Sequence, residues 1–315
     1  MSKPFTIVVC TYNGSRFISL VIEALLKQNN LHELVHEIMI VDNKSTDNTK
    51  DIILEHSLKH PLINYCFEEK QGLSNARRHA SKAQTDWVIF VDDDNLLQCD
   101  WLIELQRTIE ENPNAGVING AVIACCIDEL TNEELHCLHA MYHNLACTHL
   151  KEEDIKGSKP NLIPMGAGMC VKVEALKVID KEGWLVLTGR TKNSLSSGED
   201  TELSNRVFAQ GYKYVCNYNM RLKHIIPASR LSSEYMTRLI IGLTNGRYDF
   251  ISNNRMFIIS RFLRCIKYIA MIVYMKHIFK KSKVDSIEAF SAKYNILSAK
   301  TFISRTKNDL LIGRN

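Results

Sequence analysis

The sequence predicts an α/β fold in which a mostly parallel sheet is flanked by helices. Apolar runs typical of buried strands alternate with amphipathic segments as far as Asn112. Several of these runs, such as Trp87–Val91, contain β-branched and aromatic residues without polar interruption, as buried parallel strands do. Polar and acidic residues follow the runs, at the positions where sheets of this kind bind ligands.

The first part of the chain supplies four pairs of a strand and a helix. The segment after the first strand shows helical periodicity, because Phe17, Val21 and Leu25 recur on one face. Asp100 is a residue type that caps helix N-termini. The predicted elements are a strand at 5–10, a helix at 16–28, a strand at 37–41, a helix at 48–59, a strand at 64–68, a helix at 72–83, a strand at 87–91 and a helix at 100–112.

Beyond residue 112 the alternation becomes less regular. Gly166 and Gly168 lie in an otherwise apolar segment, and glycines inside a strand permit the close approach of another group. The predicted elements are a strand at 117–127, a helix at 130–150, a strand at 161–173, a helix at 198–210 and strands at 212–217 and 220–225. We expect one ligand-binding domain, 1–230, followed by a helical C-terminal extension, 231–315.

Composition argues against nucleic-acid binding and against a zinc ribbon. The net charge of +4 is small for 315 residues, so no strongly basic surface is indicated. The ten cysteines include no Cys-x-x-Cys pair, and we interpret them as reduced thiols of a cytoplasmic protein. The first residues lack the layout of a signal peptide.

The segment 250–284 contains no Asp or Glu but eight Lys and Arg residues, among them Arg255, Lys276 and Lys283. A basic and apolar helix of this kind is typical of an interfacial membrane anchor, which we predict over 255–283. The alternative is a helix that packs on its own domain or on a second subunit, which would make the protein a homo-oligomer.

The run Asp92-Asp93-Asp94 ends the strand at 87–91. Three adjacent carboxylates repel one another, and a divalent cation, which prefers oxygen ligands, offsets that repulsion. The alternative is a solvated acidic turn. Polar groups also end other predicted elements, and we expect them to meet at one crevice: Thr11-Tyr12-Asn13, Asp42 and Glu199-Asp200.

The chain resembles the family 2 glycosyltransferases, which have the GT-A fold, over roughly residues 5–225. The matching motifs are Val-Val-Cys-Thr-Tyr-Asn-Gly, Ile-Val-Asp-Asn-Lys-Ser-Thr-Asp, Gly-Leu-Ser-Asn-Ala-Arg-Arg, Phe-Val-Asp-Asp-Asp-Asn and Gly-Glu-Asp-Thr-Glu-Leu-Ser-Asn-Arg. The resemblance implies transfer of a sugar from a nucleotide donor to an acceptor hydroxyl, usually with inversion at the anomeric carbon.

The resemblance implies that the first two strand ends bind the nucleotide. Thr11 and Asp42 can hydrogen-bond the edge of the base, where an Asp selects an N–H donor such as that of uracil or thymine. Tyr12 stacks on or borders the base, and Asn13 belongs to the same pocket. The alternative for Asp42 is a turn residue that caps 45–46.

Arg77 follows Gly72-Leu73-Ser74-Asn75-Ala76 and can pair with phosphate or with the aspartates. The next position is usually Asn in the family and is Arg78 here. The sequence therefore leaves open which of the two arginines points inward.

The acidic run is expected to hold the ribose and a cation. Asp92 would contact the ribose, Asp94 would bind Mg²⁺ or Mn²⁺ bridging the diphosphate, and Asp93 could serve either end. The resemblance also places His224 as a further metal ligand, although a lone His is more often a surface or core residue.

Direct displacement needs a base that accepts the proton of the attacking hydroxyl, and we assign this role to Asp200. Glu199 beside it would raise the pKa of its neighbour and could orient the acceptor. The alternative is that these acids only stabilise a helix N-terminus.

Four further features of the sequence lie outside the matching motifs. The glycines at 166 and 168 would leave room for the donor sugar, and Trp184 could bind the acceptor or belong to the core. The segment 192–197 could act as a lid. His139 and His143 have metal-ligand spacing, but we favour a solvated or acceptor-facing helix for them.

The sequence therefore predicts a metal-dependent inverting glycosyltransferase that uses a nucleoside-diphosphate-sugar of the UDP or dTDP type. By association with the family it resembles, its acceptor would be a glycan or a lipid-linked sugar at the inner face of the cell membrane, in assembly of bacterial surface polysaccharide. A sugar nucleotidyltransferase is disfavoured because 11–16 contains one Gly and one Arg. A non-catalytic nucleotide-sugar-binding subunit is the other alternative.

Overall fold

The computed structural model describes residues 3–160, 163–192, 194–252, 257–283 and 286–311. The chain divides into two compact units. The first consists of Met1–Cys125, Ala146–Thr188 and Glu199–Ile226, and the second of Cys126–Leu145, Gly189–Gly198 and Pro227–Asn315. The chain leaves the first unit for the last time after Ile226. The sequence analysis placed the domain boundary at residue 230. Two inner segments, 126–145 and 189–198, group with the C-terminal helices, which the sequence analysis did not anticipate.

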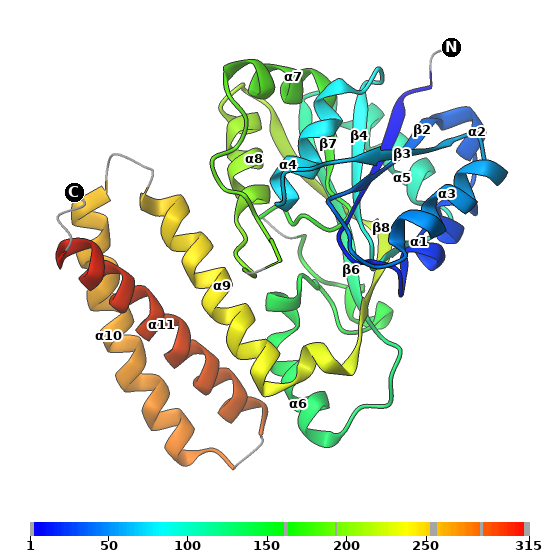
Figure 1. The fold of residues 1–315 in the computed structure, drawn as a ribbon. Helices are drawn as coiled ribbons and strands as arrows, with labels where there is room; N and C mark the ends of the chain where they lie inside the picture. Colours follow the sequence, from blue (N-terminus) through cyan, green and yellow to red (C-terminus); the bar gives the residue numbers. More distant parts are fainter. Residues whose placement is uncertain (1–2, 161–162, 193, 253–256, 284–285, 312–315) are drawn as a thin grey trace. The chain divides into compact units, whose positions relative to one another are not determined.

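The first unit is built on an eight-stranded mixed sheet with the order β3-β2-β1-β4-β7-β6-β8-β5 (Figure 1). The four N-terminal strands are parallel, and β6 runs in the same direction because β7 is antiparallel to both β4 and β6. The predicted α/β fold with a mostly parallel sheet is thus confirmed. The strands are β1 (Phe5–Thr11), β2 (Val35–Asp42), β3 (Ile63–Phe67), β4 (Trp87–Asp92), β5 (Asn95–Leu97), β6 (Ala115–Cys126), β7 (Cys170–Lys172) and β8 (Lys213–Ile226).

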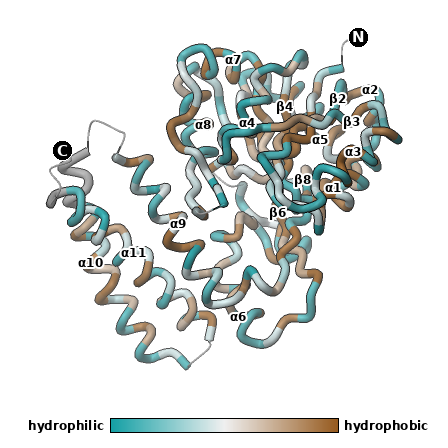
Figure 2. The backbone as a smooth tube through the Cα atoms, viewed as in Figure 1, coloured by the Kyte–Doolittle hydropathy of each residue, from teal (hydrophilic) through white to brown (hydrophobic). Residues whose placement is uncertain are grey.

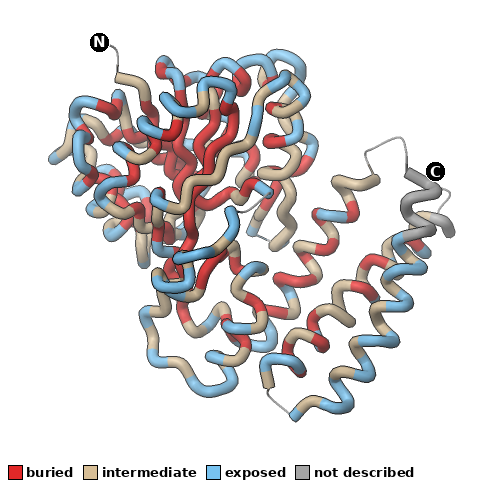
Figure 3. Tube along the Cα trace, turned by 180° about the vertical axis from the view of Figure 1, so that it is seen from behind, coloured by how far each residue is buried: buried red, intermediate tan, exposed pale blue. Residues whose placement is uncertain are grey.

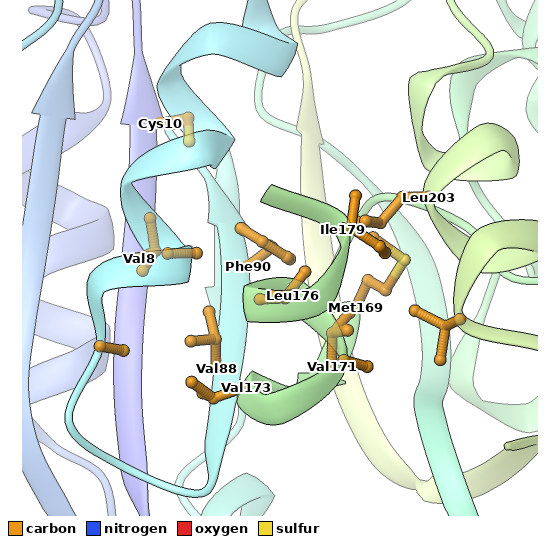
Figure 4. Close-up of a cluster of buried hydrophobic side chains, with 14 of the residues drawn as sticks. Val8, Cys10, Val88, Phe90, Met169, Val171, Val173, Leu176, Ile179 and Leu203 are labelled. Carbon is orange, nitrogen blue, oxygen red and sulfur yellow. The ribbon is translucent and has the colours of Figure 1, made fainter. Parts of the chain in front are cut away.

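The sheet is buried because its central strands are apolar on both faces (Figure 3). Figure 4 shows one face, where Val8, Val88 and Phe90 pack against Leu176 and Ile179. The helices that cover this face are α4 (Leu73–Arg78), continued by the 3₁₀ helix η1 (His79–Lys82), α7 (Val173–Glu182) and α8 (Glu199–Phe208).

The remaining helices of the first unit include α1 (Ile18–Leu26), α2 (Leu31–Leu34), α3 (Thr49–Lys59), α5 (Trp101–Glu111) and η3 (Glu152–Ile155). In α1 the buried residues recur with helical spacing, at Ile18, Val21, Ile22 and Leu25. Thus α1 forms where the sequence predicts a helix and is shorter at both ends. Neither Phe17 nor Asp100 makes a side-chain capping bond to its helix.

Four predicted elements differ from the structure. The helix expected over 130–150 ends early, as α6 (Asn132–Met141) and η2 (Tyr142–Leu145), because Ala146 adopts a left-handed φ of 58°. Of the strand expected over 161–173, residues 161 and 162 lie outside the described part, and the described residues form only the short strand β7, which α7 follows at once. The two strands expected at 212–217 and 220–225 form the single strand β8, in which the Asn217 side chain donates to Thr108 Oγ1 at 2.8 Å.

The second unit contains α6 and η2, the 3₁₀ helix η4 (Ala228–Leu231) and the long helices α9 (Ser233–Ser252), α10 (Phe257–Lys281) and α11 (Ile287–Leu311). Phe302 of α11 packs against Tyr248 of α9 and Tyr268 of α10. Arg305 pairs with Asp249 at 2.6 Å. The predicted helical extension is therefore confirmed as a packed helical group. Among the described helices, none is both long and apolar enough to cross a bilayer.

The predicted membrane anchor, 255–283, is only partly covered by the structure. Residues 255 and 256 and the side chains of 257–263 lie outside the described part. Over the rest of α10, hydrophobic and hydrophilic residues are mixed (Figure 2). Ile266, Ile269 and Val273 are each at least half exposed and lie on one face by their helical spacing.

Candidate active site

Polar side chains from three parallel strands meet at the carboxyl edge of the sheet. The register aligns Thr11 with Asp42 and Cys10 with Asp92, so β1, β2 and β4 end at the same level. Thr11 Oγ1 donates to Asp93 Oδ2 at 2.6 Å. The structure therefore brings together strand ends that lie far apart in the sequence, as expected from parallel strands.

Asp42 is buried, and both of its carboxylate oxygens have donors. Oδ1 accepts the Ser45 amide at 2.8 Å, and Oδ2 accepts the Tyr65 hydroxyl at 3.0 Å. Burial and the bond to Asp42 raise the pKa of Tyr65 to about 12. The turn-capping alternative for Asp42 is thus present in the structure. A carboxylate has about four acceptor positions, so a base edge could still bind. Tyr65 belongs to no recognised motif, so the sequence did not indicate that it contacts Asp42.

Asn13 ties the loop after β1 to the loop after β2. Its side-chain oxygen accepts the backbone amide of Thr46 at 2.7 Å, and its backbone amide donates to Ser45 Oγ at 2.9 Å. The residue has a left-handed φ of 55°, which Asn tolerates better than most residues. Tyr12 beside it is half-buried. The Asn13 side chain therefore fixes the shape of the predicted nucleotide pocket.

Arg77, on α4, lies inside the first unit, whereas Arg78 points to the surface. Arg77 is 2% exposed, with Nη2 3.7 Å from Asp92 Oδ1 and Nη1 3.4 Å from Glu199 Oε1. Its guanidinium also lies over the Phe90 ring. Burial lowers the pKa of Arg77, but Glu199 and Asp92 outweigh that and raise it overall. Arg78 instead bonds the surface residue Asp180 at 2.6 Å.

Asp200 reaches the same cluster through the backbone of Gly166. Its Oδ2 accepts the Gly166 amide at 3.0 Å, and its Oδ1 accepts the Thr201 amide at 2.7 Å. A Cβ on Gly166 would lie 2.7 Å from Arg77 Nη2 and 3.4 Å from Asp200 Oδ2. Gly166 thus makes room for Arg77. The space beside Gly168 is filled by Trp101 and Leu222, which corrects the expectation that this glycine leaves room for a sugar.

The two acids of α8 have different surroundings. Glu199 is 3% exposed and faces Arg77, whereas Asp200 is half-buried. Both lie in the first turn of a ten-residue helix, where the helix dipole favours negative charge. The predicted helix-terminus role and a catalytic role are compatible, because the side chains extend toward Arg77 and Gly166.

Asp94 and His224 form a buried pair near the same strand end. Asp94 Oδ2 lies 3.4 Å from His224 Nε2, and Asp94 Oδ1 accepts the Asn95 amide group at 3.0 Å. The antiparallel pairing of β5 with β8 places Asn95 directly opposite His224. Burial lowers the pKa of His224, but Asp94 and Cys147 outweigh it and raise the pKa to about 10.

This pair fits a divalent cation as two of its ligands. Two atoms that bind one Mg²⁺ at right angles lie roughly 3 Å apart, close to the separation of Asp94 Oδ2 and His224 Nε2. Within the described residues, no group of three or more His, Cys, Asp or Glu side chains forms a metal site. A cation here would therefore take its other ligands from phosphate and water, as Mg²⁺ commonly does.

The structure also describes most of the remaining sequence candidates. Trp184 donates its indole N–H to the Ser74 carbonyl oxygen at 2.8 Å and packs against the core, in line with its core alternative. His139 and His143 are exposed. In the predicted lid, residue 193 lies outside the described part. The loop backbone around Leu195 and Ser197 lies against the glycines of α9.

Comparison with known proteins identifies the family to which this sequence is similar. The model named glycosyl transferase family 2 matches residues 6–173, just over half of the chain. A glucosyl-dolichyl phosphate glucuronosyltransferase of Haloferax volcanii is 24% identical over 228 residues, covering 70% of this chain and 68% of that protein. The putative teichuronic acid biosynthesis glycosyltransferase TuaG of Bacillus subtilis is 33% identical over 111 residues, which cover 34% of this chain and 42% of TuaG.

A solved structure has the same fold over nearly the whole chain. It is a mannosyltransferase of Pyrobaculum calidifontis in complex with GDP-mannose and Mn²⁺, with a TM-score of 0.55 and 15% identity. The match covers 99% of this chain and 76% of that one. At this identity the likeness shows the GT-A-like fold alone.

Proposed function

This chain belongs to glycosyl transferase family 2, and from that membership we propose that it is a metal-dependent, inverting glycosyltransferase. Its donor would be a nucleoside-diphosphate-sugar and its acceptor a hydroxyl group. The observation that carries the proposal is the buried Arg77, which joins Asp92 at the end of β4 to Glu199 at the start of α8. Acidic groups from distant parts of the chain are thereby held at one site.

Thr11 and Asp42 would bind the base, with Tyr12 beside it. A carboxylate selects a base edge that presents an N–H group, as uracil and thymine do. Guanine also presents N–H groups, so nucleotides of the UDP, dTDP and GDP types belong in the same comparison. Asn13 would act indirectly, by holding the loops after β1 and β2 together.

Asp94 and His224 would hold Mg²⁺ or Mn²⁺, with Asp92 on the ribose and Asp93 held by Thr11. A cation bound there would offset the negative charge that the leaving diphosphate gains. Asp94 is buried and bonded through both oxygens, so its carboxylate is already oriented for a ligand on the His224 side.

Asp200 would be the base. In the displacement, the acceptor oxygen bonds to the anomeric carbon, the bond from that carbon to the diphosphate breaks, and the hydroxyl proton passes to an Asp200 oxygen. The amides of Gly166 and Thr201 fix the orientation of the carboxylate and leave it lone pairs for that proton. Glu199 would act through Arg77, whose charge it holds in place.

The acceptor would be a glycan or a lipid-linked sugar of the cell surface, reached from the cytoplasmic face of the membrane. Support comes from α10, where the exposed Ile266, Ile269 and Val273 share a face with Lys276 and Lys280. An apolar stripe that continues into lysines suits an anionic lipid surface.

A thermal-shift panel tests the donor assignment. UDP-, dTDP- and GDP-sugars are each added with Mn²⁺ and with EDTA. A donor at 100 times its dissociation constant should stabilise the protein by about 2.7 kcal/mol, and only when the cation is present. Slow release of free nucleoside diphosphate would exclude a non-catalytic binding subunit. No stabilisation by any nucleotide would contradict the proposal.

A further inference from the structure

The imidazole of His224 is held on both sides by buried groups. Its Nε2 faces Asp94 at 3.4 Å, and its Nδ1 lies 3.8 Å from the sulfur of Cys147. Both His224 and Cys147 are buried. The contact brings together residues 77 positions apart in the sequence, and no motif indicates it.

The backbone that carries Cys147 is fixed in an unusual conformation. Ala146 has a φ of 58°, which a residue with a Cβ adopts at a cost. The next residue, Thr148, is clamped to β6: its Oγ1 accepts the Val122 amide at 2.8 Å and donates to the Val122 carbonyl at 3.1 Å. Its own amide also donates to that carbonyl at 2.8 Å. These bonds hold Cys147 against His224.

We propose that Cys147 is a positioning residue of the metal site, whose sulfur accepts the Nδ1–H of His224. The proposal rests on the proposed function, in which His224 binds a divalent cation through Nε2. A neutral imidazole that binds a cation through one nitrogen carries its proton on the other, and that N–H needs an acceptor when it is buried. Cys147 is placed to supply it, so the ring keeps the tautomer and orientation that present Nε2 beside Asp94.

The direct test is Mn²⁺ affinity, measured by the electron paramagnetic resonance signal of free Mn²⁺ added alone to the full chain. Loss of an outer partner of a metal-binding His typically weakens binding about 10- to 100-fold. We expect a loss in this range for Cys147→Val, which fills the space without an acceptor. We expect a smaller loss for Cys147→Ser, whose hydroxyl can still accept the N–H.

Two further variants separate the possible outcomes. Cys170→Val is the matched control, because Cys170 is equally buried in the first unit and its sulfur contacts the Gly168 carbonyl instead. His224→Ala tests the metal site itself. If His224→Ala binds Mn²⁺ like the unchanged protein, the proposed metal site is wrong. If His224→Ala loses affinity while Cys147→Val does not, only the role of Cys147 is wrong.

A measurement on the His224 ring distinguishes loss of the hydrogen bond from a general loss of stability in the Cys147 variants. Histidine side chains labelled with ¹⁵N report the tautomer of His224 in the presence of Mg²⁺, with His224→Ala identifying the signal. The unchanged protein and Cys147→Ser should show the Nδ1–H form. The Cys147→Val protein should show a mixture of both forms, and an unchanged tautomer would overturn the proposal even if the variant is less stable.

Discussion

Arg77 of α4 and Glu199 of α8 face each other in the interior of the first unit, with Nη1 3.4 Å from Oε1. Each is almost completely buried, and 122 positions separate them in the sequence. Burial of a charge is costly unless an opposite charge lies beside it. Removal of either residue would therefore leave the charge of the other uncompensated in the interior. The same guanidinium also contacts Asp92, which makes Arg77 the link between the acidic strand end and α8.

Replacement of Arg77 by Met should destabilise the protein by about 3–5 kcal/mol, because it removes the cation that faces the buried Glu199 carboxylate. Arg78→Met is the control: the side chain of Arg78 is 54% exposed, and an exposed pair contributes roughly 0–1 kcal/mol. Urea unfolding measures both. Equal losses of stability would show that Arg77 does not hold the cluster together.

Asp200→Asn should retain donor binding and lose turnover by roughly 10²-fold or more, because the amide keeps the shape of the carboxylate but cannot accept the proton. Glu202→Gln is the control from the same helical turn. The two oxygens of Glu202 accept the Val186 and Leu187 amides, both at 2.9 Å, so Gln removes the charge and one acceptor there, as Asn does at position 200. Turnover is measured as the release of nucleoside diphosphate with acceptor present. Near-normal turnover of Asp200→Asn would remove Asp200 from the role of base.

Asp94→Asn should abolish the dependence of donor binding on Mn²⁺. In the unchanged protein, EDTA should remove the thermal stabilisation given by the donor, and Mn²⁺ should restore it. In the variant, the charge that attracts the cation is lost, so donor titrations with Mn²⁺ and with EDTA should coincide. Asp180→Asn, on the surface beside Arg78, is the matched control. A variant that still responds to Mn²⁺ would show that the cation binds elsewhere.

The sequence was sufficient for the four parallel strands β1 to β4 and for the acidic residues that follow them, because apolar runs and their polar ends are local signals. It did not predict β5, and its expectations for β7 and β8 differ from the structure. It could not decide between Arg77 and Arg78, since both follow the same motif and only the packing of α4 on Phe90 distinguishes them. It also could not reveal Cys147, which follows the left-handed Ala146 and contacts His224, 77 positions further along the chain. Such contacts depend on tertiary structure and leave no pattern in the sequence.

Gly246→Ala should lower turnover, although Ala is usually the better helix former by about 1 kcal/mol. Within the second unit, an added Cβ at Gly246 would collide with the Ser197 carbonyl oxygen, and one at Gly242 would collide with that of Leu195. The loop that contains Leu195 and Ser197 leads directly into α8 and Asp200, so its displacement should disturb the base.

Arg247→Ala, on the exposed side of the same helical turn, is the control for that substitution. The two variants are compared by turnover and by thermal unfolding followed by circular dichroism. A more stable Gly246→Ala protein with unchanged turnover would show that the loop does not depend on this contact.

Replacement of both Ile269 and Val273 by Asp should weaken binding to vesicles that contain anionic lipid. These side chains are 53% and 66% exposed and lie on the face of α10 that carries Lys276, so the substitutions remove apolar surface and oppose the lysine charge. Leu58→Asp is the control, because Leu58 is 89% exposed on α3, which belongs to the first unit. Vesicle sedimentation at low and high salt measures binding, and light scattering measures the oligomeric state. If the double variant binds vesicles unchanged but a dimer of the unchanged protein becomes monomeric, this face of α10 contacts a second subunit and the membrane assignment fails.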